Sequence, residues 1–300
     1  MPSREANEVS QVGISLVRAK DLEEVELHDF SRAEQLIVLL HGFTSHGKYL
    51  QWLGIRLCNV PRSLVMLVSY DSYLGIQHAA DNLCNLMNLY DTITEGKIRE
   101  QRVFLVAHSM GGLVARAVAL DQSWGSAVRG VALLGVPNNG AFVANRDMGY
   151  LVKYGQYLSG FMPDAQNPSC LSAKELVKAD SNQPYIDELN ARWATSNALP
   201  PTLSIAGGYK QLEFTRNFLV NKLINIGVQR AIGNRSNDGL IAEESVDLNN
   251  FPPPFPSGCT HLNTYPDFSR INHTNLIKNQ TIALELIKWI IQIAGVPYIP

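Results

Sequence analysis

One serine lies in a segment typical of a catalytic nucleophile. It is Ser109, in VFLVAHSMGGLVARAVAL at residues 103–120. The apolar residues before it predict a buried strand, and the two glycines after it open an apolar helix. Such a tight strand–turn–helix needs small residues two positions before and after the serine, where Ala107 and Gly111 stand. The pentapeptide alone also surrounds ordinary turn serines, but this context predicts a nucleophile with its Oγ exposed at the helix N-terminus.

A second segment could stabilise the negative charge that such a nucleophile creates. In LIVLLHGFTSHG, residues 36–47, a buried strand runs into a His41–Gly42–Phe43 turn. The turn can aim the backbone N–H of Phe43 at a reacting carbonyl, and the N–H of Met110 would be a second donor. Each donor of such an oxyanion hole is worth about 3–4 kcal/mol to the barrier. His41 itself is interpreted as a structural residue that fixes the turn.

A nucleophilic serine needs a neutral imidazole as its base. We predict His273, in RINHTNL, because it lies in a loop directly before a C-terminal helix and after all the expected strands. His261, earlier in the chain, stays open as an alternative. The other five of the seven histidines are His28, His41, His46, His78 and His108.

The imidazole in turn needs a carboxylate that orients it. We predict Asp238, in NRSNDGLI, where Asn-Asp-Gly allows a sharp turn, although the same residues are a plain turn signal. Asp247 and Asp267 are the alternatives. The resulting order along the chain, serine before aspartate before histidine, is one in which catalytic triads occur.

Continuous apolar strands that alternate with amphipathic helices must position these residues. This pattern predicts an α/β fold with a mostly parallel sheet covered on both faces. In such sheets the chemistry gathers at the carboxyl ends of the strands. The expected strands are 13–17, 23–27, 36–40, 64–69, 103–107, 130–134 and 202–206, and the expected helices are 76–90, 110–121, 183–195 and 274–293.

Two segments, 142–200 and 209–235, are longer than ordinary connections and are predicted to be insertions in a single domain (1–300). In the first, aromatic residues recur at helical spacing from Tyr150 onward. Two compatible interpretations stay open: a helix packed on the core, or a cap or lid over an apolar pocket. The expected substrate contacts in such a pocket are Leu113, Tyr150 and Tyr154.

Composition excludes several classes of protein. The chain carries 25 Lys+Arg against 27 Asp+Glu, so it lacks the basic surface by which proteins bind nucleic acid. Its apolar runs are far shorter than the ~20 residues of a transmembrane segment. The first residues lack the apolar segment that is typical of a signal peptide. The four cysteines form no C-x-x-C or Cys/His spacing, which favours reduced thiols. These features together favour a soluble, cytoplasmic protein.

The motifs together resemble the α/β-hydrolase superfamily, and within it the bacterial-type serine lipases and esterases. The resemblance runs from about residue 34 to the end, through LLHGFTSHG, LVAHSMGGLVAR, LLGVPNNGA, SNDGLI and NHTNL. It implies the α/β-hydrolase fold, with Ser109 as nucleophile, Asp238 as acid, His273 as base, and Phe43 and Met110 as oxyanion donors.

Two positions depart from the pattern of this family. Ala107 stands where many members have glycine, as it does in the small bacterial lipases. Asn275 stands where the calcium-dependent bacterial lipases have a metal-binding aspartate. We therefore expect neither a metal nor another cofactor.

The leading functional hypothesis is a carboxylic-ester hydrolase that acts on lipid-like or other apolar esters through an acyl-enzyme. An alternative keeps the acyl-enzyme but passes the acyl group to an acceptor alcohol, which makes an acyltransferase. A less favoured alternative is a non-catalytic binding protein built on the same fold. A complete triad in the right order argues against a pure binder.

Overall fold

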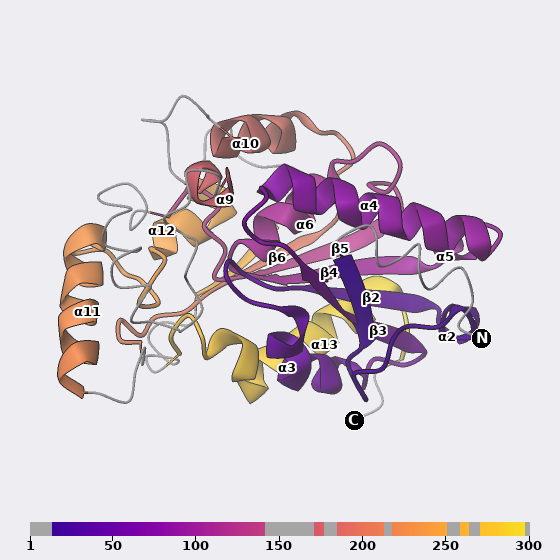
Figure 1. The fold of residues 1–300 in the computed structure, drawn as a ribbon, viewed down its shortest axis with the longest axis horizontal. Helices are drawn as coiled ribbons and strands as arrows, with labels where there is room; N and C mark the ends of the chain where they lie inside the picture. Colours follow the sequence, from indigo (N-terminus) through magenta and orange to yellow (C-terminus); the bar gives the residue numbers. More distant parts are fainter. Residues whose placement is uncertain are drawn as a thin grey trace.

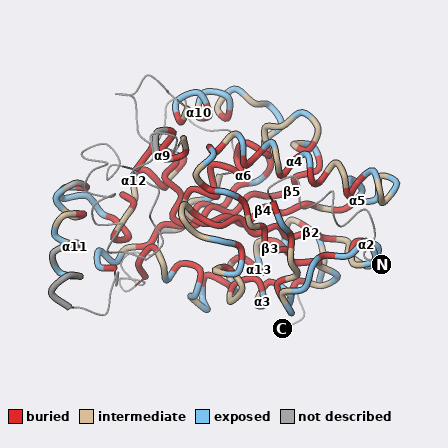
Figure 2. The backbone as a smooth tube through the Cα atoms, viewed as in Figure 1, coloured by how far each residue is buried: buried red, intermediate tan, exposed pale blue. Residues whose placement is uncertain are grey.

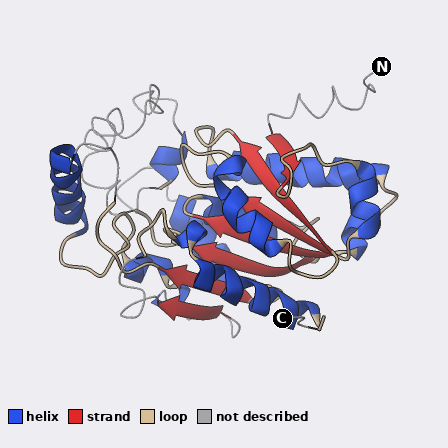
Figure 3. Ribbon diagram, turned by 90° about the horizontal axis from the view of Figure 1, so that it is seen from below, coloured by secondary structure: helices blue, strands red, loops and turns tan. Residues whose placement is uncertain are grey.

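The computed structural model describes residues 14–141, 171–176, 185–212, 218–250, 259–263 and 271–297. Seven strands of this part form one sheet in the order β1-β3-β2-β4-β5-β6-β7. Only β1 runs antiparallel to its neighbour, and the other pairs are parallel. The strands are β1 (Ile14–Arg18), β2 (Gln35–Leu40), β3 (Ser63–Tyr70), β4 (Arg102–His108), β5 (Val128–Leu134), β6 (Thr202–Ala206) and β7 (Cys259–Asn263). The carboxyl ends of the parallel strands meet at one edge of the sheet (Figure 3).

Helices cover both faces of this sheet (Figure 1). On one face lie α4 (Ile76–Ile93), α6 (Gly111–Ala119) and α10 (Tyr185–Thr195), and on the other lie α3 (Gln51–Leu57) and α13 (Gln280–Ala294). The remaining described helices are α2 (Leu27–Arg32), α5 (Lys97–Glu100), α9 (Leu171–Glu175), α11 (Phe218–Ile232) and α12 (Glu243–Val246), with 3-10 turns at Gly47–Leu50, Leu248–Asn250 and Leu276–Lys278.

The strands are apolar on both sides because each side packs against helices. All six residues of β2 are buried, and Figure 2 shows the central strands as the most buried part of the molecule. Alternate residues of each strand enter different cores, as the two-residue period of a strand requires. In β4, Leu105 and Ala107 join the core under α4 and α6, whereas Phe104 and Val106 join the core under α3 and α13. The predicted fold class is confirmed.

Several short helices and the longer α11 were not predicted, and the structure differs from the predicted elements at three further places. The expected strand 23–27 is wrong: Glu24 forms a single bridge, and a capping box at Glu26 starts helix α2 instead. Strand β7 was not predicted. The last helix begins at Gln280 rather than near 274, because the side chain of Asn279 caps it by accepting from the N–H of Ile282 (3.1 Å).

Candidate active site

Ser109 occupies the turn between β4 and α6 in a strained conformation. Its φ is +54°, in the left-handed backbone region that residues other than glycine rarely adopt. Its N–H donates to the carbonyl of Leu134 at 2.9 Å, which ties the turn to β5. A Cβ at Gly111 would lie 2.4 Å from the carbonyl oxygen of His41, so no larger residue fits there. Ser109 is only partly buried, as a nucleophile at such a turn must be.

The turn after β2 lies directly against this serine. A Cβ at Gly42 would lie 2.8 Å from the Cβ of Ser109 and 3.3 Å from its Oγ. The next residue is Phe43, and Met110 follows the serine. Within the part of the chain that the structure describes, neither of their backbone N–H groups donates a hydrogen bond. Two free donors therefore flank Ser109, as an oxyanion hole requires.

His41 fixes this turn, as its sequence context suggests. Its Nδ1 donates to the carbonyl of Gly42 (2.8 Å), and its Nε2 accepts from the N–H of Tyr70 (3.3 Å). The Tyr70 hydroxyl donates to the carbonyl of His41, and the two rings stack with centroids 4.1 Å apart. Burial lowers the pKa of His41 to about 4. The imidazole is thus neutral at physiological pH and fully engaged in hydrogen bonds.

His273 and Asp238 form a buried hydrogen-bonded pair. The Nδ1 of His273 lies 2.7 Å from Oδ2 of Asp238, and both residues are almost fully buried. The other carboxylate oxygen, Oδ1, accepts from the N–H groups of Leu240 (3.1 Å) and Ile241 (2.8 Å). The N–H of His273 also donates to the Asp238 carbonyl at 2.8 Å. The carboxylate is therefore held in place on both oxygens, and Nε2 is the ring nitrogen left for a reacting group.

Two glycines allow the neighbouring strands to approach this pair. A Cβ at Gly135, where φ is +59°, would lie 3.0 Å from both Oδ2 of Asp238 and Nδ1 of His273. A Cβ at Gly207 would lie 2.9 Å from the Cβ of Asp238. These residues follow β5 and β6, so the pair lies at the carboxyl edge of the sheet. The ring of His108, the residue before Ser109, lies 4.6 Å from the His273 ring between centroids, which brings the elbow and the imidazole together.

The alternative residues lie elsewhere. His261 is on β7, and its Nδ1 lies 3.8 Å from Oδ1 of Asp247. The alternative base and one of the alternative acids therefore face each other. Neither ring nitrogen of His261 has a hydrogen-bond partner in the described part of the chain, and burial lowers its pKa. Asp267 lies outside the described residues. The pairing therefore favours Asp238 and His273 over Asp247 and His261.

Of the expected substrate contacts, only one is described. Leu113 is fully buried in the core under α6, and Tyr150 and Tyr154 lie outside the described residues. Phe43 instead packs edge-on against Tyr73, with ring centroids 5.4 Å apart. The adjacent Leu74 is 49% exposed. The loop between β3 and α4 thus places the ring of Tyr73 against Phe43 of the turn after β2, a contact that the sequence did not predict because it joins distant segments.

Residues 171–176 of the first insertion are anchored on this same loop. The N–H of Leu171 donates to the carbonyl of Tyr73 at 3.0 Å. The Oγ of Ser172 accepts from the N–H of Gly75 (2.9 Å), and Oε2 of Glu175 accepts from the N–H of Ile76 (2.5 Å). Glu175 caps the N-terminus of α4, and burial raises the pKa of its carboxyl group. Helix α9 is therefore held next to the apolar side chains at the candidate site.

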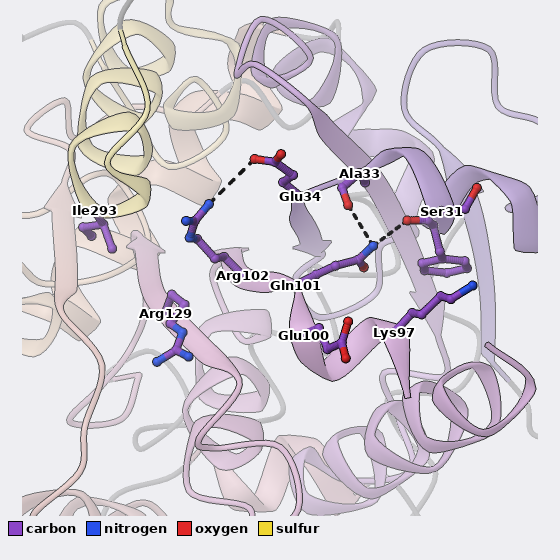
Figure 4. A pocket seen from close by; sticks show the side chains of 10 residues that line it. Ser31, Ala33, Glu34, Lys97, Glu100, Gln101, Arg102, Arg129 and Ile293 are labelled. Carbon is purple, nitrogen blue, oxygen red and sulfur yellow. Dashed lines mark hydrogen bonds and ion pairs between the residues drawn. The ribbon is translucent and has the colours of Figure 1, made fainter. Parts of the chain in front are cut away.

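A cavity of about 730 Å³ lies at the opposite edge of the sheet (Figure 4). Several of its lining residues, such as Glu34, Arg102 and Arg129, stand at or before the amino ends of strands, and Arg102 lies 4.0 Å from Glu34. This cavity is distinct from the candidate active site.

Across the described ranges, no three His, Cys, Asp or Glu side chains are grouped to hold a metal ion. No helix in those ranges is long and apolar enough to cross a membrane.

Comparisons with known proteins agree with this architecture. Residues 76–162, which include the serine elbow, match the family model of the PGAP1-like alpha/beta domain. A comparison with curated protein sequences finds no match.

Solved structures with the same fold include two bacterial lipolytic enzymes. The lipase BlEst2 from Bacillus licheniformis, in its mature form, aligns with a TM-score of 0.59 and 14% identity over 92% of this chain and 97% of the lipase. The phospholipase PlaB from Legionella pneumophila aligns with a TM-score of 0.56 and 14% identity over 87% of this chain and 60% of PlaB. With the sheet, the elbow and the buried pair already described, these likenesses confirm the resemblance that the motifs indicate: the chain has the α/β-hydrolase fold and is lipase-like in structure.

Proposed function

We propose that the protein is a serine hydrolase that cleaves carboxylic esters of lipid-like or other apolar substrates through an acyl-enzyme. The observation that carries the proposal is the buried 2.7 Å contact between Nδ1 of His273 and Oδ2 of Asp238, close to the strained turn that carries the partly buried Ser109. A structural histidine has no need of a carboxylate held by two further backbone donors. This arrangement instead fixes the imidazole with Nε2 free, as a general base requires.

In the proposed first step, Oγ of Ser109 attacks the ester carbonyl carbon and passes its proton to Nε2 of His273. Asp238 stabilises the imidazolium that results. The carbonyl oxygen becomes an oxyanion, which the backbone N–H groups of Phe43 and Met110 stabilise. When the tetrahedral intermediate collapses, the bond to the leaving alcohol breaks and the proton on Nε2 goes to the alcohol oxygen. The acyl group stays on Ser109.

In the second step, water attacks the acyl-enzyme while Nε2 accepts one of its protons. Collapse of the new intermediate releases the carboxylic acid and returns the proton to Oγ of Ser109. If an acceptor alcohol took the place of water, the same machinery would act as an acyltransferase.

The apolar surroundings support an acyl chain rather than a charged group as the recognised part of the substrate. Phe43 packs against Tyr73, and Leu74, the next residue along the chain, is an exposed apolar side chain. Burial of an acyl chain contributes roughly 0.8 kcal/mol per CH₂. We expect Tyr150 and Tyr154 of the first insertion to extend this lining.

Hydrolysis of p-nitrophenyl esters, with and without a fluorophosphonate, tests this function. The purified protein should release p-nitrophenol, and prior treatment with the fluorophosphonate should abolish the release. Added acceptor alcohols distinguish the two reactions: a hydrolase forms free acid, whereas an acyltransferase forms a new ester at the expense of acid. A wild-type protein that neither hydrolyses any ester in the series nor reacts with the fluorophosphonate would refute the proposal.

A further inference from the structure

His108 is a buried imidazole to which the proposed mechanism gives no part. It ends β4 and directly precedes Ser109. Since Phe104 and Val106 enter the core under α3 and α13, the two-residue period of the strand directs His108 to the same face. The segment that carries His273 and leads into α13 lies on this face, so the two histidines meet although they are far apart in the sequence.

The contact between them is a hydrogen bond to the backbone. Nε2 of His108 donates to the carbonyl oxygen of His273 at 2.9 Å. The backbone N–H of His273, in turn, donates to the carbonyl of Asp238 at 2.8 Å. The main chain of His273 is thus held at both its N–H and its C=O, and its ring is held at Nδ1 by Asp238. Among the hydrogen bonds of the described residues, the one from His108 is the only direct link between His273 and β4, the strand that leads into Ser109.

The state of His108 suits a fixed donor. It is fully enclosed, and burial together with the nearby His273 lowers its pKa to about 3. The ring therefore stays neutral wherever the enzyme would work, and the hydrogen bond persists while His273 gains and loses its proton. A second positive charge 4.6 Å from the His273 ring would oppose the imidazolium that catalysis needs, and a neutral ring avoids this.

We propose that His108 is a positioning residue, which sets the distance between the imidazole of His273 and Oγ of Ser109 by tying the His273 carbonyl to the end of β4. The proposal rests on the function proposed above. Misplacement of a catalytic group by about 1 Å can cost roughly 100-fold in rate. Loss of this tie should therefore lower kcat without weakening substrate binding.

The pair His108→Gln and His108→Met tests this proposal, because the two side chains have similar length and only glutamine can donate a hydrogen bond. We expect H108M to lower kcat by about 10- to 100-fold with KM within about twofold of the wild type, and H108Q to restore most of kcat. Equal thermal stability of the two variants serves as the control for folding. Equal kcat in H108M, H108Q and the wild type would overturn the proposal, and so would equal losses in both variants.

A second readout does not depend on turnover. In ¹⁵N-histidine NMR spectra, the Nδ1 proton of His273 that faces Asp238 should exchange with water faster in H108M than in the wild type or H108Q. An unchanged exchange rate in H108M would overturn the proposal. If the wild type shows no esterase activity and no fluorophosphonate reaction, the proposed function fails and the catalytic role of His108 fails with it. If the wild type is active and H108M equals it, only the role of His108 fails.

Discussion

Replacement of Asp238 by asparagine should leave the fold intact but prevent His273 from acting as a base. Oδ1 of Asp238 accepts from the N–H groups of Leu240 and Ile241, and an asparagine keeps these two bonds only by turning its own oxygen toward them. Its NH₂ group then faces Nδ1 of His273, where Oδ2 accepts in the wild type. The imidazole must accept at Nδ1 and carry its proton on Nε2. In this tautomer it cannot take a proton from Ser109.

The expected loss is about 10⁴-fold in kcat, as for other triads with the wrong tautomer, which corresponds to about 5 kcal/mol of barrier. Hydrolysis of a p-nitrophenyl ester gives the loss in kcat, and thermal unfolding of the same variant gives the change in its unfolding free energy. The unfolding free energy should change by only about 1–2 kcal/mol. The matched control is Asp247→Asn, which alters the rival pair with His261 and should leave kcat within a few-fold. An inactive D247N variant together with an active D238N variant would refute the assignment of Asp238 as the triad carboxylate.

Three further outcomes are expected. Gly42→Ala should lower kcat by about 100-fold, because its Cβ would lie 2.8 Å from the Cβ of Ser109; wild-type kinetics would contradict this packing. Lowering the pH from about 7.5 to about 5.5 should reduce the unfolding free energy in urea by roughly 1 kcal/mol for each of His41 and His108. Burial lowers the pKa of each in the folded protein, so the unfolded chain binds protons first; a pH-independent stability would refute this. The rate of ester hydrolysis should rise from acetate to hexanoate, and a preference for acetate would rule out an apolar acyl site.

The fold and the order of the candidate triad could be predicted from the sequence because both depend on local patterns. Continuous apolar segments such as LIVLL predict buried parallel strands, and the elbow needs only the few residues around Ser109. The choice of Asp238 and His273 followed from their positions after the strands. The 2.7 Å contact between them supports that choice, but no spacing in the sequence measures it.

The features that were missed depend on contacts between distant segments. Strand β7 has mixed polarity in CTHLN and is a strand because it pairs with β6 at the edge of the sheet. The segment at 23–27 alternates apolar and charged residues like a strand, but the capping box at Glu26 starts a helix. Likewise, the sequence shows that His108 stands beside the serine, but only the structure shows that its Nε2 reaches the carbonyl of His273.

The most direct test of the central claim is to map the site of covalent reaction by mass spectrometry. The folded wild-type protein is treated with a fluorophosphonate, digested, and compared with the Ser109→Ala and His273→Ala variants. A single modified peptide that contains Ser109, lost in S109A and strongly reduced in H273A, is the result that the proposed mechanism predicts. Modification at a different serine, or equal modification of the wild type and H273A, would contradict it.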